Sequence, residues 1–137
     1  MNERQLAFKI LNKIERDNAY SNLTLDAALR ENAAASASSA FVTALVYGVT
    51  ERKITLDFIL SRYLTKPLKK LRPEVLTVLR LGAFQLCFMD KVPASAAVNE
   101  SVNLAKKFCK GRQGFINGVL RTYTKEKYTI KLPDRTE

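Results

Sequence analysis

The segment PEVLTVLRLGAFQLCFM (residues 73–89) decides the fold of this chain. On a helical wheel of about 100° per residue, its apolar side chains surround the helix almost completely: Val75, Val78, Leu79, Leu81, Phe84, Leu86, Phe88 and Met89. A helix that is apolar all round is buried at the centre of a bundle. Pro73 suits the first position of a helix, because its missing N–H needs no partner there. The segment therefore predicts a central helix over residues 74–89.

The segments around this helix are amphipathic with the helical period, and none alternates like a strand. A stripe of leucine, isoleucine and alanine marks the first helix, and Asn18 to Ser21 predicts a turn. The small, polar stretch from Ala33 to Ser39 predicts a loop whose serines can cap the next helix. We expect an all-α bundle of about seven helices, over residues 2–17, a short helix after Ser21, and residues 38–52, 54–64, 74–89, 93–109 and 113–126.

Length and charge bound the class of protein. The chain has 137 residues, of which 47% are apolar, so it is long enough for one domain with a single core. Lysine and arginine number 23 against 13 acids, a net charge of +10. Such a surplus indicates a polyanionic partner, because phosphate neutralisation drives nucleic-acid affinity. The alternative is a basic protein whose self-repulsion only keeps it soluble. A membrane surface is disfavoured, because no basic helix has an apolar face to spare.

Several function classes are disfavoured by the sequence. There is no histidine, no glycine-rich loop after a strand and no catalytic constellation, so we expect no catalytic residue, cofactor site or metal site in this chain. Cys87 and Cys109 stand outside any CxxC spacing and are predicted to be reduced structural thiols in the cytoplasm. The N-terminus has no apolar core of a secretory signal.

Basic residues gather in three clusters, each of which could contact RNA phosphates or merely face solvent. The linker cluster is Lys66, Lys69, Lys70 and Arg72. The junction cluster is Lys106, Lys107, Lys110 and Arg112. The first-helix cluster is Lys9, Lys13 and Arg16, with Arg4 beside it. Together with the net charge they predict that at least one cluster touches RNA. Aromatic residues that could stack on bases are Tyr20, Tyr47, Tyr123 and Tyr128, although packing is the better interpretation of each.

A second set of polar residues is predicted to form an internal network: Arg80, Gln85, Asn99, Glu100 and Asn117. A buried guanidinium needs a carboxylate. We therefore expect Arg80 to pair with Glu100. Recognition of RNA bases is the alternative role for these residues.

The sequence resembles the NusB-like family over nearly its whole length. The residues that carry the resemblance are VLRLGAFQLCFMDKVPASAAVNESVNLAKK (78–107), GFINGVLR (114–121), RQLAFKILNKIERDNAYSNLTLDAAL (4–29) and FVTALVYGVTERKITLDFIL (41–60). The resemblance implies a NusB-like helical bundle in two packed subdomains. It is closest to the N-terminal RNA-binding domain of the RsmB (Sun/Fmu) ribosomal-RNA cytosine-5 methyltransferases, since Gln85 and Arg121 stand where NusB proteins usually carry other residues.

The resemblance implies an RNA-binding domain over residues 1–126 that helps position small-subunit ribosomal RNA. Residues 127–137, KYTIKLPDRTE, are interpreted as the start of a linker to a methyltransferase domain. In that branch S-adenosylmethionine and two catalytic cysteines belong to the C-terminal domain, and Cys87 and Cys109 match neither cysteine. Two alternatives remain: a standalone antitermination factor that binds boxA RNA with a ribosomal protein, and a protein-docking domain without RNA affinity.

Overall fold

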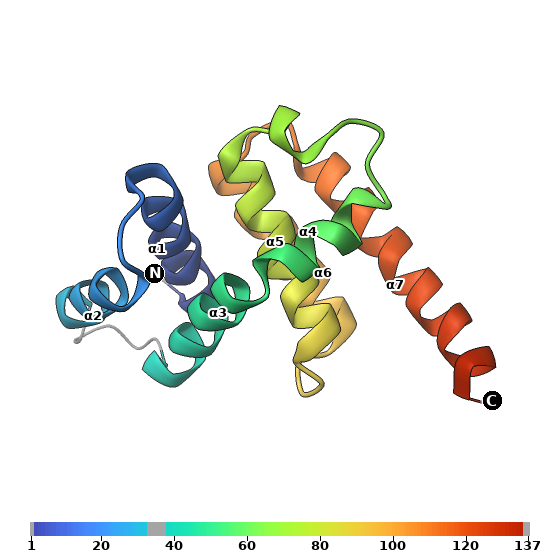
Figure 1. The fold of residues 1–137 in the computed structure, drawn as a ribbon, viewed down its shortest axis with the longest axis horizontal. Helices are drawn as coiled ribbons and strands as arrows, with labels where there is room; N and C mark the ends of the chain where they lie inside the picture. The colour runs from blue at the N-terminus through green and yellow to red at the C-terminus, as the bar shows by residue number, and fades with distance from the viewer. Residues whose placement is uncertain (1, 33–37, 136–137) are drawn as a thin grey trace.

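The fold is that of a helical bundle, as the sequence predicts. A computed structural model describes residues 2–32 and 38–135, of which 128–135 as backbone only. Within these ranges there are seven α-helices, one short 3-10 helix and no strand: α1 Glu3–Asp17, α2 Ser21–Glu31, α3 Ser39–Glu51, α4 Lys53–Ser61, η1 Leu68–Lys70, α5 Pro73–Phe88, α6 Ala94–Phe108 and α7 Gln113–Arg135. In Figure 1, α1 to α3 lie on one side and α5 to α7 on the other, in agreement with two packed subdomains.

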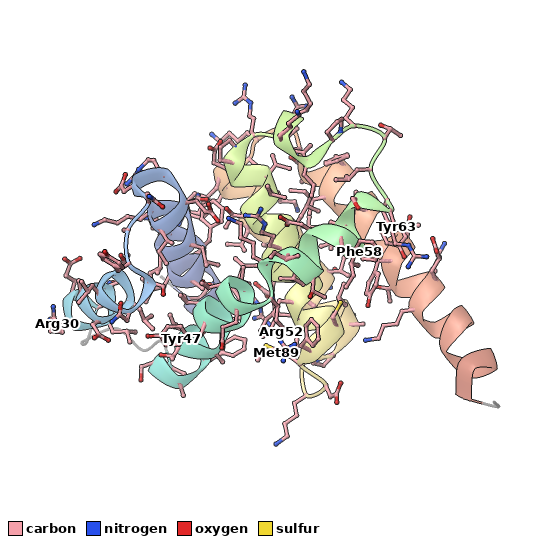
Figure 2. The ribbon with its side chains drawn as sticks, viewed as in Figure 1. Arg30, Tyr47, Arg52, Phe58, Tyr63 and Met89 are labelled. Atoms are coloured by element: carbon pink, nitrogen blue, oxygen red, sulfur yellow. The ribbon has the colours of Figure 1, made fainter. Side chains whose placement is uncertain are left out.

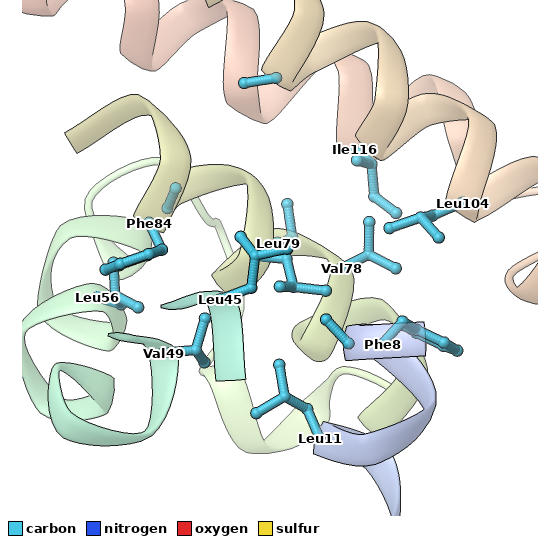
Figure 3. Packing of buried hydrophobic residues seen from close by; sticks show 14 of the residues in the cluster. Phe8, Leu11, Leu45, Val49, Leu56, Val78, Leu79, Phe84, Leu104 and Ile116 are labelled. Atoms are coloured by element: carbon cyan, nitrogen blue, oxygen red, sulfur yellow. The ribbon is translucent and has the colours of Figure 1, made fainter. Parts of the chain in front are cut away.

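Helix α5 is the central helix that its sequence predicts. Every residue from Thr77 to Leu86 is buried, including Arg80 and Gln85. The helix packs against α1, α3, α4, α6 and α7. Figure 3 shows how its side chains Val78, Leu79 and Phe84 meet residues from both subdomains. The hydrophobic burial of α5 therefore holds the two subdomains together.

Helix α3 packs closely against α5 at Gly48. A Cβ at this position would lie 2.0 Å from the ring of Phe84, so only glycine leaves room for the ring. This contact fixes α3 against the C-terminal half of α5.

The helix ends follow the capping chemistry of the sequence. The side chain of Asn2 accepts a hydrogen bond from the backbone of Gln5 in a capping box, and Asn18 ends α1 in the left-handed conformation. Ser38 caps α3 by accepting a hydrogen bond from Phe41, so the predicted serine cap is confirmed. The rest of the predicted loop, residues 33–37, lies outside the described residues.

The last helix is longer than predicted. α7 runs from Gln113 to Arg135, whereas the sequence pattern had indicated an end near residue 126. The prediction that helical structure stops at Lys127 is wrong. An amphipathic stripe reports contact with a core, and its loss does not require the backbone to leave the helical conformation. The role of residues 127–137 as a linker remains a prediction.

Among the described residues, no helix combines the length and apolar character needed to cross a membrane.

Candidate nucleic-acid interface

The linker cluster and the junction cluster meet at one end of the bundle. The linker with η1, the first turn of α5 and the α6–α7 junction come together at the top of Figure 1. A groove of about 400 Å³ there is lined by Lys66, Lys70 and Arg72 from the linker and by Arg112 from the junction. Its apolar lining comes from Leu64, Leu71, Val75 and Phe115. Two clusters that are 40 residues apart in sequence thus share one cavity.

A second groove continues this surface around the same end. It has a volume of about 450 Å³, and Arg72, Lys107, Lys110 and Arg112 line it. All of these basic side chains are exposed. We call this surface the basic pole and define it as Lys66, Lys69, Lys70, Arg72, Lys107, Lys110 and Arg112.

The first-helix cluster reaches the basic pole at two places. The Lys9 ammonium lies 5.9 Å from the centre of the Phe108 ring, and the Lys107 ammonium lies 5.5 Å from the same ring. Arg16 shares a groove with Lys69 and forms an ion pair with its neighbour Asp17 at 2.9 Å. Lys13 and Lys106 are exposed but line none of these three grooves.

Arg4 has a different environment from the rest of its cluster. Its Nε donates a hydrogen bond of 2.7 Å to the buried Gln85 side chain, and its guanidinium lies 5.2 Å from the centre of the Phe41 ring. Gln85 in turn donates to the carbonyl oxygen of Leu81. The structure therefore places Arg4 in the internal polar network that we had predicted around Gln85.

The ion pair predicted for Arg80 has other partners than expected. Arg80 donates to both carboxylate oxygens of Asp57 on α4, at 2.7 and 2.8 Å, and lies 3.4 Å from Glu15 on α1. Glu15 also pairs with Lys53 at 2.6 Å. The predicted Arg80–Glu100 pair is wrong, because Arg80 faces α1 and α4 whereas Glu100 lies on α6.

Three other members of the predicted network lie outside it. Asn99 is exposed and Glu100 is half-buried on α6. Asn117 accepts a hydrogen bond from its helix neighbour Arg121. The prediction of an internal network thus holds for Arg80 and Gln85 and is wrong for these three residues.

Phe115 is an exposed aromatic residue of the candidate interface that the sequence pattern did not identify. Its neighbour Ile116 is fully buried, but 42% of the surface of Phe115 is exposed and it lines the first groove. It lies in the first turn of α7, where the groove opens. Its position three residues after Arg112 is the signal that could have identified it.

Of the tyrosines considered as stacking residues, Tyr20, Tyr47 and Tyr123 do not line these grooves. Tyr20 is 77% exposed at the start of α2, and Tyr47 is half-buried on α3. Tyr123 accepts a hydrogen bond from Cys87 at 3.0 Å and packs edge-on against Tyr63. Burial raises the pKa of Tyr123, so its hydroxyl stays protonated. The side chain of Tyr128 lies outside the described residues.

Both cysteines have weakly acidic thiols. Burial, followed by the negative charge of Glu74, raises the pKa of Cys109 to about 11. Burial also raises the pKa of Cys87. Neither thiol is activated for nucleophilic chemistry. No group of three or more potential metal ligands occurs in the part of the chain that the structure describes.

The NusB family model matches residues 1–125 of the chain. A probable ribosomal RNA small subunit methyltransferase B of Bacillus subtilis (strain 168) is 39% identical over 124 residues, which are 90% of this chain and 28% of that protein. The transcription antitermination protein NusB of Latilactobacillus sakei is 38% identical over 130 residues, with 88% of this chain and 92% of that protein covered.

A solved structure titled "Crystal Structure of Antitermination Factors NusB and NusE in complex with dsRNA" contains a chain with the same fold. Its TM-score is 0.79 at 23% identity, and the match covers 90% of this chain and 94% of that one.

Proposed function

This chain belongs to the NusB family, and we propose that it is the RNA-binding N-terminal domain of a small-subunit ribosomal-RNA cytosine-C5 methyltransferase. In this proposal the domain positions ribosomal RNA in the cytoplasm and is not itself catalytic. S-adenosylmethionine and the methyl transfer belong to a C-terminal domain, which is also its partner. The basic pole supplies the contacts to phosphates.

The observation that carries the proposal is the meeting of two basic clusters around an exposed aromatic ring. Lys66, Lys70, Arg72 and Arg112 line one groove with Phe115. Cations that have no carboxylate partner favour a phosphate backbone. An aromatic face beside them favours an unpaired base. Arg80 and Lys53, by contrast, already form ion pairs with carboxylates of the protein.

The two branches of the family differ in the length of their proteins. The chain spans 28% of its Bacillus methyltransferase relative and 92% of its Latilactobacillus NusB relative, at nearly equal identity. Gln85 and Arg121 resemble the methyltransferase branch, which is why we favour it. The second candidate function is therefore antitermination, with boxA RNA and a ribosomal protein as ligands.

The test is binding of the purified chain to two labelled RNAs across a salt series. One RNA is a small-subunit ribosomal helix with its loop, and the other is a boxA-like single strand with its ribosomal-protein partner present. We expect preference for the ribosomal fragment, with affinity that falls steeply as salt increases. Tight, partner-dependent binding of the single strand would instead identify an antitermination factor. Absence of binding to both RNAs would leave the protein-docking alternative.

A variant with Lys66, Lys69, Lys70 and Arg72 changed to glutamine tests the basic pole directly. We expect weaker binding and a salt slope that is shallower by about 0.7–0.9 per lost contact. The matched control changes the same number of exposed cations outside the grooves: Arg30, Arg52, Lys91 and Arg121. Equal losses in the two variants would remove the linker cluster from the interface.

A further inference from the structure

A third groove lies between α1, the linker and the start of α5. Its volume is about 470 Å³, within the range of about 300–1,000 Å³ that is typical of ligand sites. Leu68, Leu71, Pro73 and Leu76 give it apolar walls. Lys69 and Arg16 line it as well, so it adjoins the basic pole.

The floor of this groove carries polar groups from two facing helices. Asn12 and Glu15 lie one turn apart on α1, and Thr77 and Arg80 lie one turn apart on α5. The Thr77 Oγ1 lies 2.7 Å from the Asn12 Oδ1 and 3.0 Å from the carbonyl oxygen of Pro73, so its one hydrogen is shared between these two acceptors and the Asn12 amide is held beside Thr77. The amide nitrogen of Asn12 then has no partner among the described residues and is free to donate.

Glu15 offers the complementary acceptor. One oxygen of its carboxylate is held by Lys53 at 2.6 Å and by Arg80 at 3.4 Å. The other oxygen has no hydrogen-bond partner within the described part of the chain. A donor on Asn12, held by the buried Thr77, and an acceptor on Glu15, held by the buried Arg80 and the half-buried Lys53, thus line the same apolar-walled groove.

The charges around the groove select the kind of group that can enter it. The carboxylates of Glu15 and Glu74, which both line the groove, disfavour an anion there, and Arg80 disfavours a cation. A flat, neutral group with both donors and acceptors fits this lining, and its phosphate would meet the exposed Lys69 at the rim. A nucleobase of RNA has this chemistry.

We propose that this groove receives one unpaired base of the bound RNA, with Asn12 and Glu15 reading its hydrogen-bonding edge. The proposal rests on the proposed function, because it adds a base-specific site to an RNA-binding surface. The basic pole fixes the backbone, and the groove selects RNA in which a base is free to leave the helix.

The variant N12D tests the groove. It removes the amide donor, keeps an oxygen that can accept from Thr77, and adds one negative charge. The matched control is N99D, because Asn99 is an exposed asparagine on α6 that receives the same change of charge. Each protein is titrated with a hairpin RNA that has an unpaired loop and with a fully paired duplex of equal length.

We expect N12D to weaken hairpin binding by on the order of tenfold relative to N99D, with duplex binding equal in the two variants. Equal hairpin affinities of N12D and N99D would overturn the groove proposal, and so would an equal loss on the duplex. Absence of binding of the unmodified protein to either RNA would overturn the proposed function and the groove with it. RNA binding that depends on the basic pole but not on Asn12 would overturn the groove and leave the proposed function standing.

A second variant makes the test independent of added charge and of stability. N12L removes the donor without a charge, and Thr77 retains its hydrogen bond to the carbonyl oxygen of Pro73. A loop base replaced by 2-aminopurine should change its fluorescence on binding the unmodified protein and not on binding N12L. The same change with both proteins would overturn the proposal.

Discussion

The basic pole and the ion cluster of Arg80, Asp57, Glu15 and Lys53 both contain basic side chains, but in opposite environments. At the pole, Arg72 and Arg112 are exposed and form no ion pair among the described residues, although Glu74 lines the second groove with them. In the ion cluster, Arg80 is 8% exposed and is held by Asp57 and Glu15. A cation that the protein already neutralises contributes to the fold, whereas one that faces water remains available for a phosphate. The net charge of +10 does not distinguish them.

The largest effect is expected from breaking the ion cluster. D57N keeps the shape of the side chain and leaves the Arg80 guanidinium buried without its main counter-charge. We expect the free energy of unfolding to fall by about 3 kcal/mol, the lower end for a broken buried pair. Urea unfolding measures this change, with D26N on the exposed face of α2 as the control.

The same variant tests whether the two regions are independent. Folded D57N should bind duplex RNA with unchanged affinity and salt slope, because Asp57 lies outside the basic pole. A loss of RNA affinity as large as that of the linker-cluster variant would show that the ion cluster shapes the interface.

A smaller effect is expected at the aromatic ring of the pole. F115A should weaken RNA binding by about 1–3 kcal/mol if an unpaired base stacks on the ring. Stability should change little, since 42% of the ring is already exposed. The control is F58A, because Phe58 is another exposed phenylalanine, at 69%, and lies on α4 away from the grooves (Figure 2). If F58A weakens RNA binding as much as F115A, stacking at the pole is contradicted.

The smallest effect concerns Cys109, which lines the second groove beside Lys107 and Lys110. Its pKa is raised to about 11 by burial and by Glu74, although cations stand nearby. In the unfolded chain a thiol ionises near pH 8.5. The folded state therefore loses stability relative to the unfolded state as pH rises from about 8.5 towards 11.

The measurement is urea unfolding of the unmodified protein and of C109A between pH 7 and pH 10.5. The decline above pH 8.5 should be shallower in C109A, which lacks the thiol. Identical declines would show that Cys109 ionises as easily in the folded protein as in the unfolded chain. The cations of the basic pole would then lower the pKa of the Cys109 thiol enough to offset the effect of its burial.

The sequence predicts the helices better than the partners of their polar residues. The all-apolar surface of α5 requires a central position, and the capping residues mark where helices begin, because both signals are local. The partners of Arg80 are not local. Asp57 and Glu15 reach it from α4 and α1, and the sequence offered Glu100 as an equally reasonable carboxylate. The way in which α1, α4 and α5 pack together decides which of these carboxylates reach Arg80.

The features of the candidate interface were also only partly predictable from the sequence. Sequence by itself determined the all-α fold, the central helix, the surplus of positive charge and the three basic clusters, because composition and helical period are properties of the chain. Only the tertiary structure decided that the linker and junction clusters share a groove, that Phe115 lies open beside them, and that Arg4 turns inward to Gln85. These results depend on which helices pack together, and contacts between residues 40 to 80 positions apart leave no periodic signal in the sequence.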